Sequence, residues 1–228
     1  RRVLVRSTEA RKKGYSVADG LSVLGTHLAE IARRHAHELF SRQDAKRYLD
    51  RVAEDHPKAV EDLVPKLLPL SSVQRVIQNL LREKVSIRDG ASILEALSEG
   101  AQNSRNVILL TEFVRQAIRR ILVQPYLNSQ NDLPIYFMIP SLERPIEEHV
   151  EHGELVSQLN LDMDSINKVL EAFRRSLESQ EGSAAVLVSA GVRPFVRQMV
   201  EASFPNLAVL SHNEIPSGVR LVSLGTIQ

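Results

Sequence analysis

The sequence predicts an α+β fold with several subdomains, in which a mainly helical N-terminal and middle part precedes a small α/β C-terminal domain. Apolar residues recur every three or four positions between Val64 and Leu122, which is the spacing of one helix face. From Leu133 onward, short apolar runs alternate with helical patterns, as in a small α/β domain. The polar, turn-forming segment that starts after Leu127 separates the two regions. We therefore expect three parts, at residues 1–40, 41–127 and 133–228.

The first part of the chain is predicted to contain a long helix from about Ser22 to Phe40. Its apolar residues and two of its histidines fall along one side. These residues are Val23, Leu24, His27, Leu28, Ile31, His35 and Leu39. Ser41, with Asp44 three residues later, is a capping signal for a further helix toward residue 56, and Pro57 is typical of a first helical turn. Before the long helix we expect a strand at 3–5, a short helix at 9–13 and an extended piece at 15–17.

Three short helices are predicted in the middle of the chain, each with one apolar face. The first has five apolar residues at the spacing i, i+3, i+4, i+7 and i+8, namely Val73, Val76, Ile77, Leu80 and Leu81. Ser86 and Asp89, three residues apart, resemble a capping signal for the second helix. The third keeps the helical period from Leu110 to Leu122. Three arginines lie mostly off its apolar face: Arg115, Arg119 and Arg120.

The second half of the chain is predicted to alternate strands with helices. Compact apolar runs that include β-branched residues indicate strands, and the longer 3.6-residue patterns between them indicate helices. In chain order we expect a strand at 133–139, helices at 141–150 and 162–181, a strand at 184–188, a helix at 192–204, and strands at 207–210 and 219–224. This order favours a small sheet covered by helices.

Composition excludes several kinds of site. The 228 residues are 43% apolar, which is enough for a core, and 29 basic against 28 acidic residues leave a formal charge of +1. Such a balance does not favour nucleic acid or an anionic membrane as the main partner. Because the chain has no cysteine, it has no disulfide, thiolate zinc site, iron–sulfur cluster or cysteine nucleophile.

The start of the chain and its longest apolar run give two further expectations. The sequence starts with Arg1 and Arg2, without methionine and without a signal-peptide pattern, so we expect a piece of a longer protein. Its longest nearly apolar run, 184–192, has about half of the roughly 20 residues that a membrane-spanning helix needs.

No motif indicates catalysis, a cofactor or a metal. His149 and His152 stand among several glutamates and could in principle bind a transition metal, but a charged, solvated helix end explains them as well. The phosphate-binding, dinucleotide-binding and zinc-protease motifs are all missing from the sequence. We therefore expect neither an enzyme nor a cofactor or metal site.

A nucleic-acid-binding module is the alternative from a different class. Arg33 and Arg34 form one basic cluster, and Arg115, Arg119 and Arg120 form another, which could neutralise a few phosphates. Aromatic residues, on which bases would stack, make up only 4% of the chain. Solvated or subunit-facing arginines are therefore the favoured interpretation.

Several segments resemble the cytoplasmic domain of the export gate family of flagellar type III secretion, which is shared with the virulence injectisome. They are GYSVAD (14–19), THL (26–28), RRHAHELFSRQDAKRYLD (33–50), EDLVPKLLPL (61–70), VQRVIQNLLREKVSIRD (73–89), ILEAL (93–97), LLTEFVRQAIRR (109–120), VRPFVRQMVE (192–201) and VLSHNEIP (209–216). As an ordered set running nearly end to end, these segments are highly specific.

The resemblance implies a non-enzymatic docking platform at the cytoplasmic face of the bacterial inner membrane. It would bind export chaperone–substrate complexes and other components of the export apparatus, order substrate delivery to the membrane channel, and form a ring, reported as nine subunits in the family. Residues 1–40 would be the C-terminal remnant of the first cytoplasmic subdomain, so most of the chaperone cleft and the membrane region would lie outside this chain. The equivalent domain of an injectisome is the nearest alternative.

The resemblance also implies roles for individual residues. The THL segment belongs to the chaperone cleft of the family, which implies chaperone contacts for Thr26 and His27. From chemistry alone, the Thr26 hydroxyl could equally bond back to the preceding helical turn. The three arginines 115, 119 and 120 are our expected subunit contacts. Gly90 stands where the family usually has a larger residue, which should loosen that helix start by up to about 1 kcal/mol.

Overall fold

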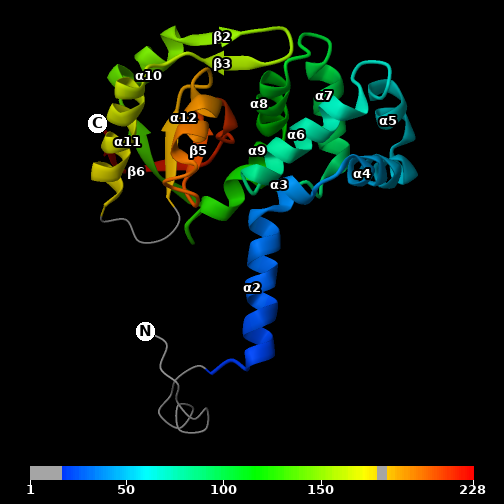
Figure 1. Ribbon diagram of the computed structural model, residues 1–228, viewed down its shortest axis with the longest axis horizontal. Helices are drawn as coiled ribbons and strands as arrows, with labels where there is room; N and C mark the ends of the chain where they lie inside the picture. Colours follow the sequence, from blue (N-terminus) through cyan, green and yellow to red (C-terminus); the bar gives the residue numbers. More distant parts are fainter. Residues whose placement is uncertain (1–16, 179–183) are drawn as a thin grey trace.

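The computed structural model describes residues 17–178 and 184–228. The elements expected at 3–5 and 9–13, most of the extended piece at 15–17 and the last residues of the helix at 162–181 lie outside the described residues. In the described part the chain forms a helical region followed by a small parallel sheet with its own helices (Figure 1). No helix of this part is long and apolar enough to cross a bilayer.

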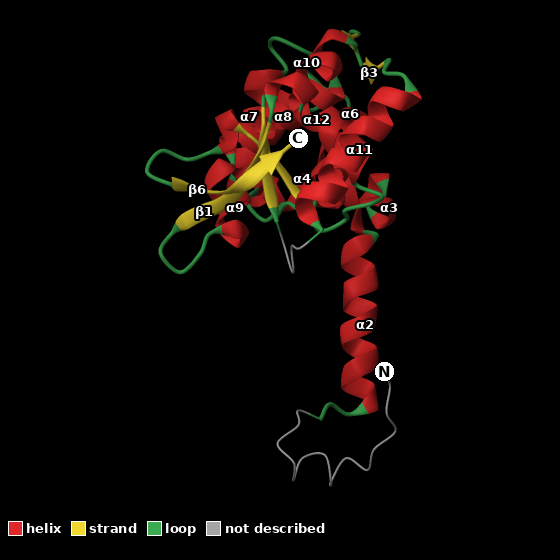
Figure 2. Ribbon diagram, turned by 90° about the vertical axis from the view of Figure 1, so that its left-hand side faces the viewer, coloured by secondary structure: helices red, strands yellow, loops and turns green. Residues whose placement is uncertain are grey.

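The long N-terminal helix is real, but it is shorter than predicted. It is α2 (Gly20–Arg34), capped by Asp19, whose side chain accepts a hydrogen bond from the Ser22 N–H. His35 interrupts the predicted run at φ −103° and ψ 15°, and one further turn, α3 (Ala36–Leu39), follows. Both views show α2 standing away from the rest of the molecule (Figures 1 and 2). None of its residues is buried.

The remaining helices of the first half pack into one bundle. In chain order they are α4 (Arg42–Asp55), α5 (Pro57–Leu63), α6 (Leu70–Arg82), α7 (Gly90–Gly100), α8 (Val107–Ala117) and α9 (Arg119–Val123), followed by a 3-10 turn, η1 (Gln124–Tyr126). The predicted capping box at Ser41 and Asp44 is present, and Pro57 opens α5 as expected. The predicted stripe of α6 lies in the core, where Val73, Val76, Ile77 and Leu80 are fully buried.

Two details of the helical prediction are wrong. The cap of α7 is Asp89, which accepts from the Ser92 N–H, whereas Ser86 lies in the loop before it. The third predicted helix is broken at Ile118 into α8 and α9, so it is not continuous to Leu122.

Gly90 has a packing role that the sequence did not indicate. It is buried, and a Cβ atom on it would collide with Val52 and press on Tyr48, both on α4. The absence of a side chain therefore allows α7 to approach α4 closely. The expected loosening of this helix start is offset by the contact that glycine permits.

The second half is an α/β unit around four parallel strands. Its elements are β1 (Asp132–Met138), α10 (Pro140–Glu148), β2 (Val150–His152), β3 (Ser157–Leu159), α11 (Met163–Leu177), β4 (Ala185–Val188), α12 (Arg193–Val200), β5 (Ala208–Ser211), a 3-10 turn η2 (His212–Glu214) and β6 (Arg220–Ile227). The strand order is β5-β4-β1-β6, and each neighbouring pair is parallel. The predicted strands and helices are thus confirmed, with boundaries shifted by a few residues.

The two faces of the sheet are covered by different parts of the chain. Along β4, Val186 and Val188 point into a core with Phe173 of α11 and Phe195 of α12. The alternate residues, such as Leu187, join the core of the helical bundle instead. The helical region and the α/β unit therefore share one core, so the polar turn after Leu127 is not a free linker between two separate bodies.

A short hairpin of β2 and β3 was not predicted. Its strands have only three residues each, too few to show a period of two. The hairpin reaches back to the helical bundle, because the Val107 N–H donates to Leu155 O at 3.1 Å and Asn106 Nδ2 donates to Ser157 Oγ at 2.9 Å. It thereby ties the α/β unit to the start of α8.

Candidate docking surface and buried charge network

The apolar side of α2 is exposed rather than packed. Leu21 is 81% exposed, Leu28 66% and Leu24 61%, and Ile31 is also exposed. These four residues form the apolar stripe of α2. Since large contiguous apolar patches on proteins mark interaction sites, this stripe is a candidate interaction surface.

Thr26 and His27 lie on the same exposed helix, but they do not lie within the apolar stripe. At 100° per residue, Thr26 falls on the side of α2 opposite Leu24 and Leu28, and His27 flanks the stripe. The Thr26 hydroxyl donates to Ser22 O at 2.8 Å. This bond is the local alternative that chemistry allowed, and it leaves the hydroxyl oxygen free to accept a further bond.

Arg115, one of the three expected subunit contacts, is instead buried within its own chain. Its side chain is 2% exposed, and it donates hydrogen bonds to Glu214 and to Glu83. The expectation of a subunit contact is therefore wrong for this side chain, because its charge is already neutralised in the interior. Arg119 and Arg120 are exposed at the start of α9, and their role stays a prediction.

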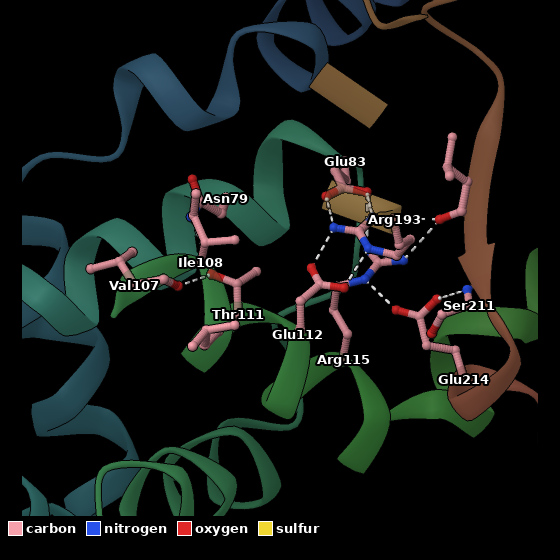
Figure 3. A network of polar contacts seen from close by, with 12 residues as sticks. Asn79, Glu83, Val107, Ile108, Thr111, Glu112, Arg115, Arg193, Ser211 and Glu214 are labelled. Atoms are coloured by element: carbon pink, nitrogen blue, oxygen red, sulfur yellow. Dashed lines mark hydrogen bonds and ion pairs between the residues drawn. The ribbon is translucent and has the colours of Figure 1, made fainter. Parts of the chain in front are cut away.

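Arg115 belongs to a network of charges at the junction between the helical bundle and the α/β unit (Figure 3). We call these five residues the buried charge network: Glu83, Glu112, Arg115, Arg193 and Glu214. Glu83 follows the last residue of α6, Glu112 and Arg115 lie on α8, Arg193 is the first residue of α12, and Glu214 ends η2. Four elements from both halves of the chain are thus joined by ion pairs.

Arg193 is the centre of this network. Its Nη1 lies 2.7 Å and its Nη2 3.0 Å from the two carboxylate oxygens of Glu83. Its guanidinium also binds both carboxylate oxygens of Glu112. Since both partners are held in bidentate fashion, the guanidinium fixes α12 against α6 and α8.

The arginines also occupy the outer edge of β5. Val209 O accepts hydrogen bonds from Arg115 and Arg193, each at 3.4 Å, and Leu207 O accepts one from Arg197 at 2.8 Å. Side chains thereby satisfy the carbonyl groups that a further strand would otherwise bind.

The network perturbs the ionisation of Glu83. Burial alone would raise the pKa of this carboxyl, but the charges of Arg115 and Arg193 and the hydrogen bonds of Arg193 outweigh burial and lower the pKa from 4.5 to about 2. A carboxyl whose folded pKa is depressed stabilises the fold above its unfolded pKa, and that stabilisation is lost as the pH falls through the folded pKa.

We therefore expect the free energy of unfolding to fall by up to about 3 kcal/mol between pH 4.5 and pH 2 on account of Glu83. Urea denaturation at a series of pH values measures this loss. The Glu83→Gln variant, which cannot ionise, is the control, and its profile should be flatter in this window. An equally steep profile in the variant would assign the acid sensitivity to other groups.

The two histidines considered as metal ligands make ordinary hydrogen bonds. His149 Nδ1 lies 2.8 Å from Pro145 O, and His152 Nδ1 lies 2.8 Å from Ser157 Oγ. In residues 17–178 and 184–228, no group of three or more metal-binding side chains lies together.

Sequence reasoning did not find the buried charge network. Glu83 and Arg193 are 110 positions apart, and Arg115 and Glu214 are 99 apart, so no local spacing connects them. One signal was available, since Arg115 directly follows Val114 on a helix with a broad apolar face. A charged residue at the border of such a face can point inward when it has a buried partner.

Comparisons with known proteins give a consistent result. The model of the FHIPEP family matches residues 5–220. The flagellar biosynthesis protein FlhA of Buchnera aphidicola subsp. Acyrthosiphon pisum is 39% identical over 208 residues, which are 91% of this chain and 30% of that protein.

Solved structures with the same fold come from related secretion proteins. The CdsV protein of Chlamydia pneumoniae, solved with CdsO, is similar with a TM-score of 0.89 and 28% identity over 97% of this chain and 66% of that chain. Nonameric EPEC SctV-C has a TM-score of 0.79 and 28% identity, over 88% of this chain and 61% of that chain. The present chain spans about a third of the length of the curated relatives it matches. Because the family model covers nearly the whole sequence and the fold agrees, this chain belongs to the FHIPEP family.

Proposed function

We propose that this chain is part of the cytoplasmic docking platform of a flagellar type III protein export gate. In this role it binds export chaperone–substrate complexes and orders their delivery to the inner-membrane channel, without catalysing a reaction. The observation that carries the proposal is the 39% identity to a flagellar FlhA over 91% of the chain. In this proposal, only a region outside this sequence contacts the membrane.

The exposed α2 helix supports a docking role. It stands apart from the body, it has no buried residue, and it presents the apolar stripe on one side and Thr26 on the other. The bundle behind it is joined to the α/β unit by a shared core and the buried charge network. A client bound at α2 would therefore be attached to the joined helical bundle and α/β unit.

We further propose that the intact protein forms a ring. SctV-C, with the same fold, is nonameric, and CdsV has been solved with CdsO, which supports contacts with other components of the apparatus. Arg119 and Arg120 are the exposed cations that we assign to the contact between subunits. Charge reversal at both positions in the full-length protein should reduce ring formation, and an unchanged ring would exclude them.

The flagellar assignment is preferred to the injectisome assignment because the flagellar FlhA relative has 39% identity, whereas the EscV cytosolic domain from the type III secretion system has 28%. The test is a titration of the domain, with its N-terminal region restored, against a flagellar chaperone loaded with substrate. An injectisome chaperone and duplex DNA are the competing probes. Selective binding of the flagellar complex supports the proposal, whereas binding of only one of the other probes would replace it.

The Thr26→Asp variant is expected to weaken binding of the flagellar chaperone–substrate complex by about tenfold or more. The new carboxylate would have to lose its hydration in the client contact, which costs about 1–3 kcal/mol or more. Isothermal titration of the domain with its N-terminal region restored measures the change, and circular dichroism checks that the helix is retained.

Two controls make this prediction specific. Thr26→Val keeps the shape of the side chain without a charge, so its effect on binding should be small. Leu24→Asp places the same charge on the opposite side of α2. Unchanged affinity in Thr26→Asp, or a loss only in Leu24→Asp, would remove Thr26 from the client surface.

A further inference from the structure

We propose that a cavity beside the outer edge of β5 binds an apolar carboxylate, an anion with a hydrocarbon body about the size of an aromatic amino acid. The cavity has a volume of about 300 Å³ and is lined by residues that follow α6, by Arg115 of α8 and Arg197 of α12, and by residues of α9, η1 and β5. Junctions between two parts of a fold are common places for ligand sites of this size. The inference does not depend on the proposed function.

Arg197, which lines the cavity, is incompletely paired. Its side chain is 8% exposed, yet its guanidinium makes one hydrogen bond, to Leu207 O, and no carboxylate of the described residues lies within ion-pair distance. Arg115 and Arg193, which are more deeply buried, each bind two carboxylates. A guanidinium has five N–H groups, so Arg197 keeps donors that a carboxylate can bind.

Among the residues that line the cavity and those of the adjoining buried charge network, cations outnumber carboxylates by one. Glu83, Glu112 and Glu214 pair with Arg115 and Arg193, and none of these three carboxylates pairs with Arg197. Lys84 adds a fourth cation at the wall, and its ammonium donates to the neutral amide oxygen of Asn206 at 2.9 Å. One negative charge on a ligand would complete the pairing.

Hydrocarbon side chains in the lining of the cavity determine the body of the ligand. The part of the lining that comes from α9 and η1 is largely hydrocarbon, with Ile121, Leu122, Pro125 and Tyr126. A small inorganic anion would reach the cations but leave this wall uncovered. An anion that carries an aromatic or branched hydrocarbon group would contact both.

The experiment is an NMR titration of the 228-residue chain with N-acetyl-L-phenylalanine as the carboxylate probe. Its neutral amide, which has the same body without the charge, is the matched ligand control. We expect saturable shifts of the backbone amides of Lys84, Asn206 and Val209 with the acid. The amide should bind about tenfold more weakly, because it lacks the charge-assisted hydrogen bonds.

Three variants test the residues. Arg197→Gln keeps a donor for Leu207 O but removes the charge, and it should lower the affinity for the acid about tenfold. Lys84→Asn removes the second charge at a position with φ 59°, which asparagine tolerates, and it should lower the affinity about threefold. Arg175→Gln, an exposed position on α11, is the control and should bind like the unaltered chain. If Arg197→Gln does not fold, Lys84→Asn and the acid–amide comparison decide.

The source of the carboxylate is distinguished by a second probe, a capped tetrapeptide with phenylalanine and aspartate in its middle. Binding of both probes supports a carboxylate displayed by a protein, and binding of the free acid alone supports a small molecule. Absence of saturable shifts with either probe up to about 10 mM, or equal affinity for acid and amide, would overturn the proposal.

Discussion

Replacement of Arg193 by methionine is expected to lower the free energy of unfolding by about 3–5 kcal/mol, because it leaves two buried carboxylates without their bidentate partner. The side chains of Glu83 and Glu112 are each only 13% exposed, and an unpaired charge that is mostly buried is costly. Urea denaturation of the variant at neutral pH measures the loss. Removing one partner of a group of buried ion pairs lowers the free energy of unfolding by more than the intact group raises it. The effect of this substitution is therefore among the largest expected of a single substitution.

The matched control is Arg174→Met on the surface of α11. Arg174 is also paired with a glutamate, Glu171, but its side chain is 60% exposed. Exposed pairs contribute little, so this variant should remain within about 0.5 kcal/mol of the unaltered chain. Similar losses in both variants would contradict the interpretation that burial makes the difference.

Replacement of Phe173 by alanine is expected to cost about 3–5 kcal/mol as well, but for a different reason. The ring is fully buried between α11 and the sheet, and its centroid lies 6.2 Å from that of Phe204. Its removal leaves a cavity that close-packed neighbours cannot fill completely. Thermal and urea unfolding of the variant measure the effect.

Met163, the first residue of the same helix, provides the comparison. Its side chain is 68% exposed, so Met163→Ala should change the free energy of unfolding by no more than about 0.5 kcal/mol. A small loss in Phe173→Ala would mean that the layer beneath α11 rearranges to close the cavity.

The helical core was predictable because it is encoded locally. The period of Val73, Val76, Ile77 and Leu80 is enough to identify the side of α6 that is buried. Capping chemistry at Ser41 was equally reliable, since it involves residues only three positions apart. The small α/β domain also followed from the alternation of strands and helices, whereas the parallel direction of its strands was not predicted.

The surroundings of the apolar side of α2 could not be predicted in the same way. Leu24, Leu28 and Ile31 have the spacing of a core-facing helix, yet they are exposed here. Periodicity identifies the apolar side of a helix, but it does not show whether the residues that pack against this side belong to the same chain. The position of Thr26 on the side of α2 opposite the apolar stripe follows from residue spacing. Its proposed contact with a chaperone rests on the resemblance to the family.

The buried charge network and the β2–β3 hairpin were missed for physical reasons. Ion pairs such as Glu83 with Arg193 depend on a tertiary approach of distant segments, and surface charges have the same local sequence signature. The amino-acid composition does not distinguish buried charged residues from charged residues on the surface. The error at Arg115 was of this type, because a charge was assumed to lie outside the fold.

The side chains that occupy the outer edge of β5 also bear on how copies of this chain can be crowded together. Because Val209 O and Leu207 O already accept bonds from arginines, a neighbouring molecule has no carbonyl ladder there to extend. Two molecules that meet along this edge cannot merge their sheets into a continuous one. Contacts made there would have to use side chains, and such contacts can form and separate without rearranging the strands.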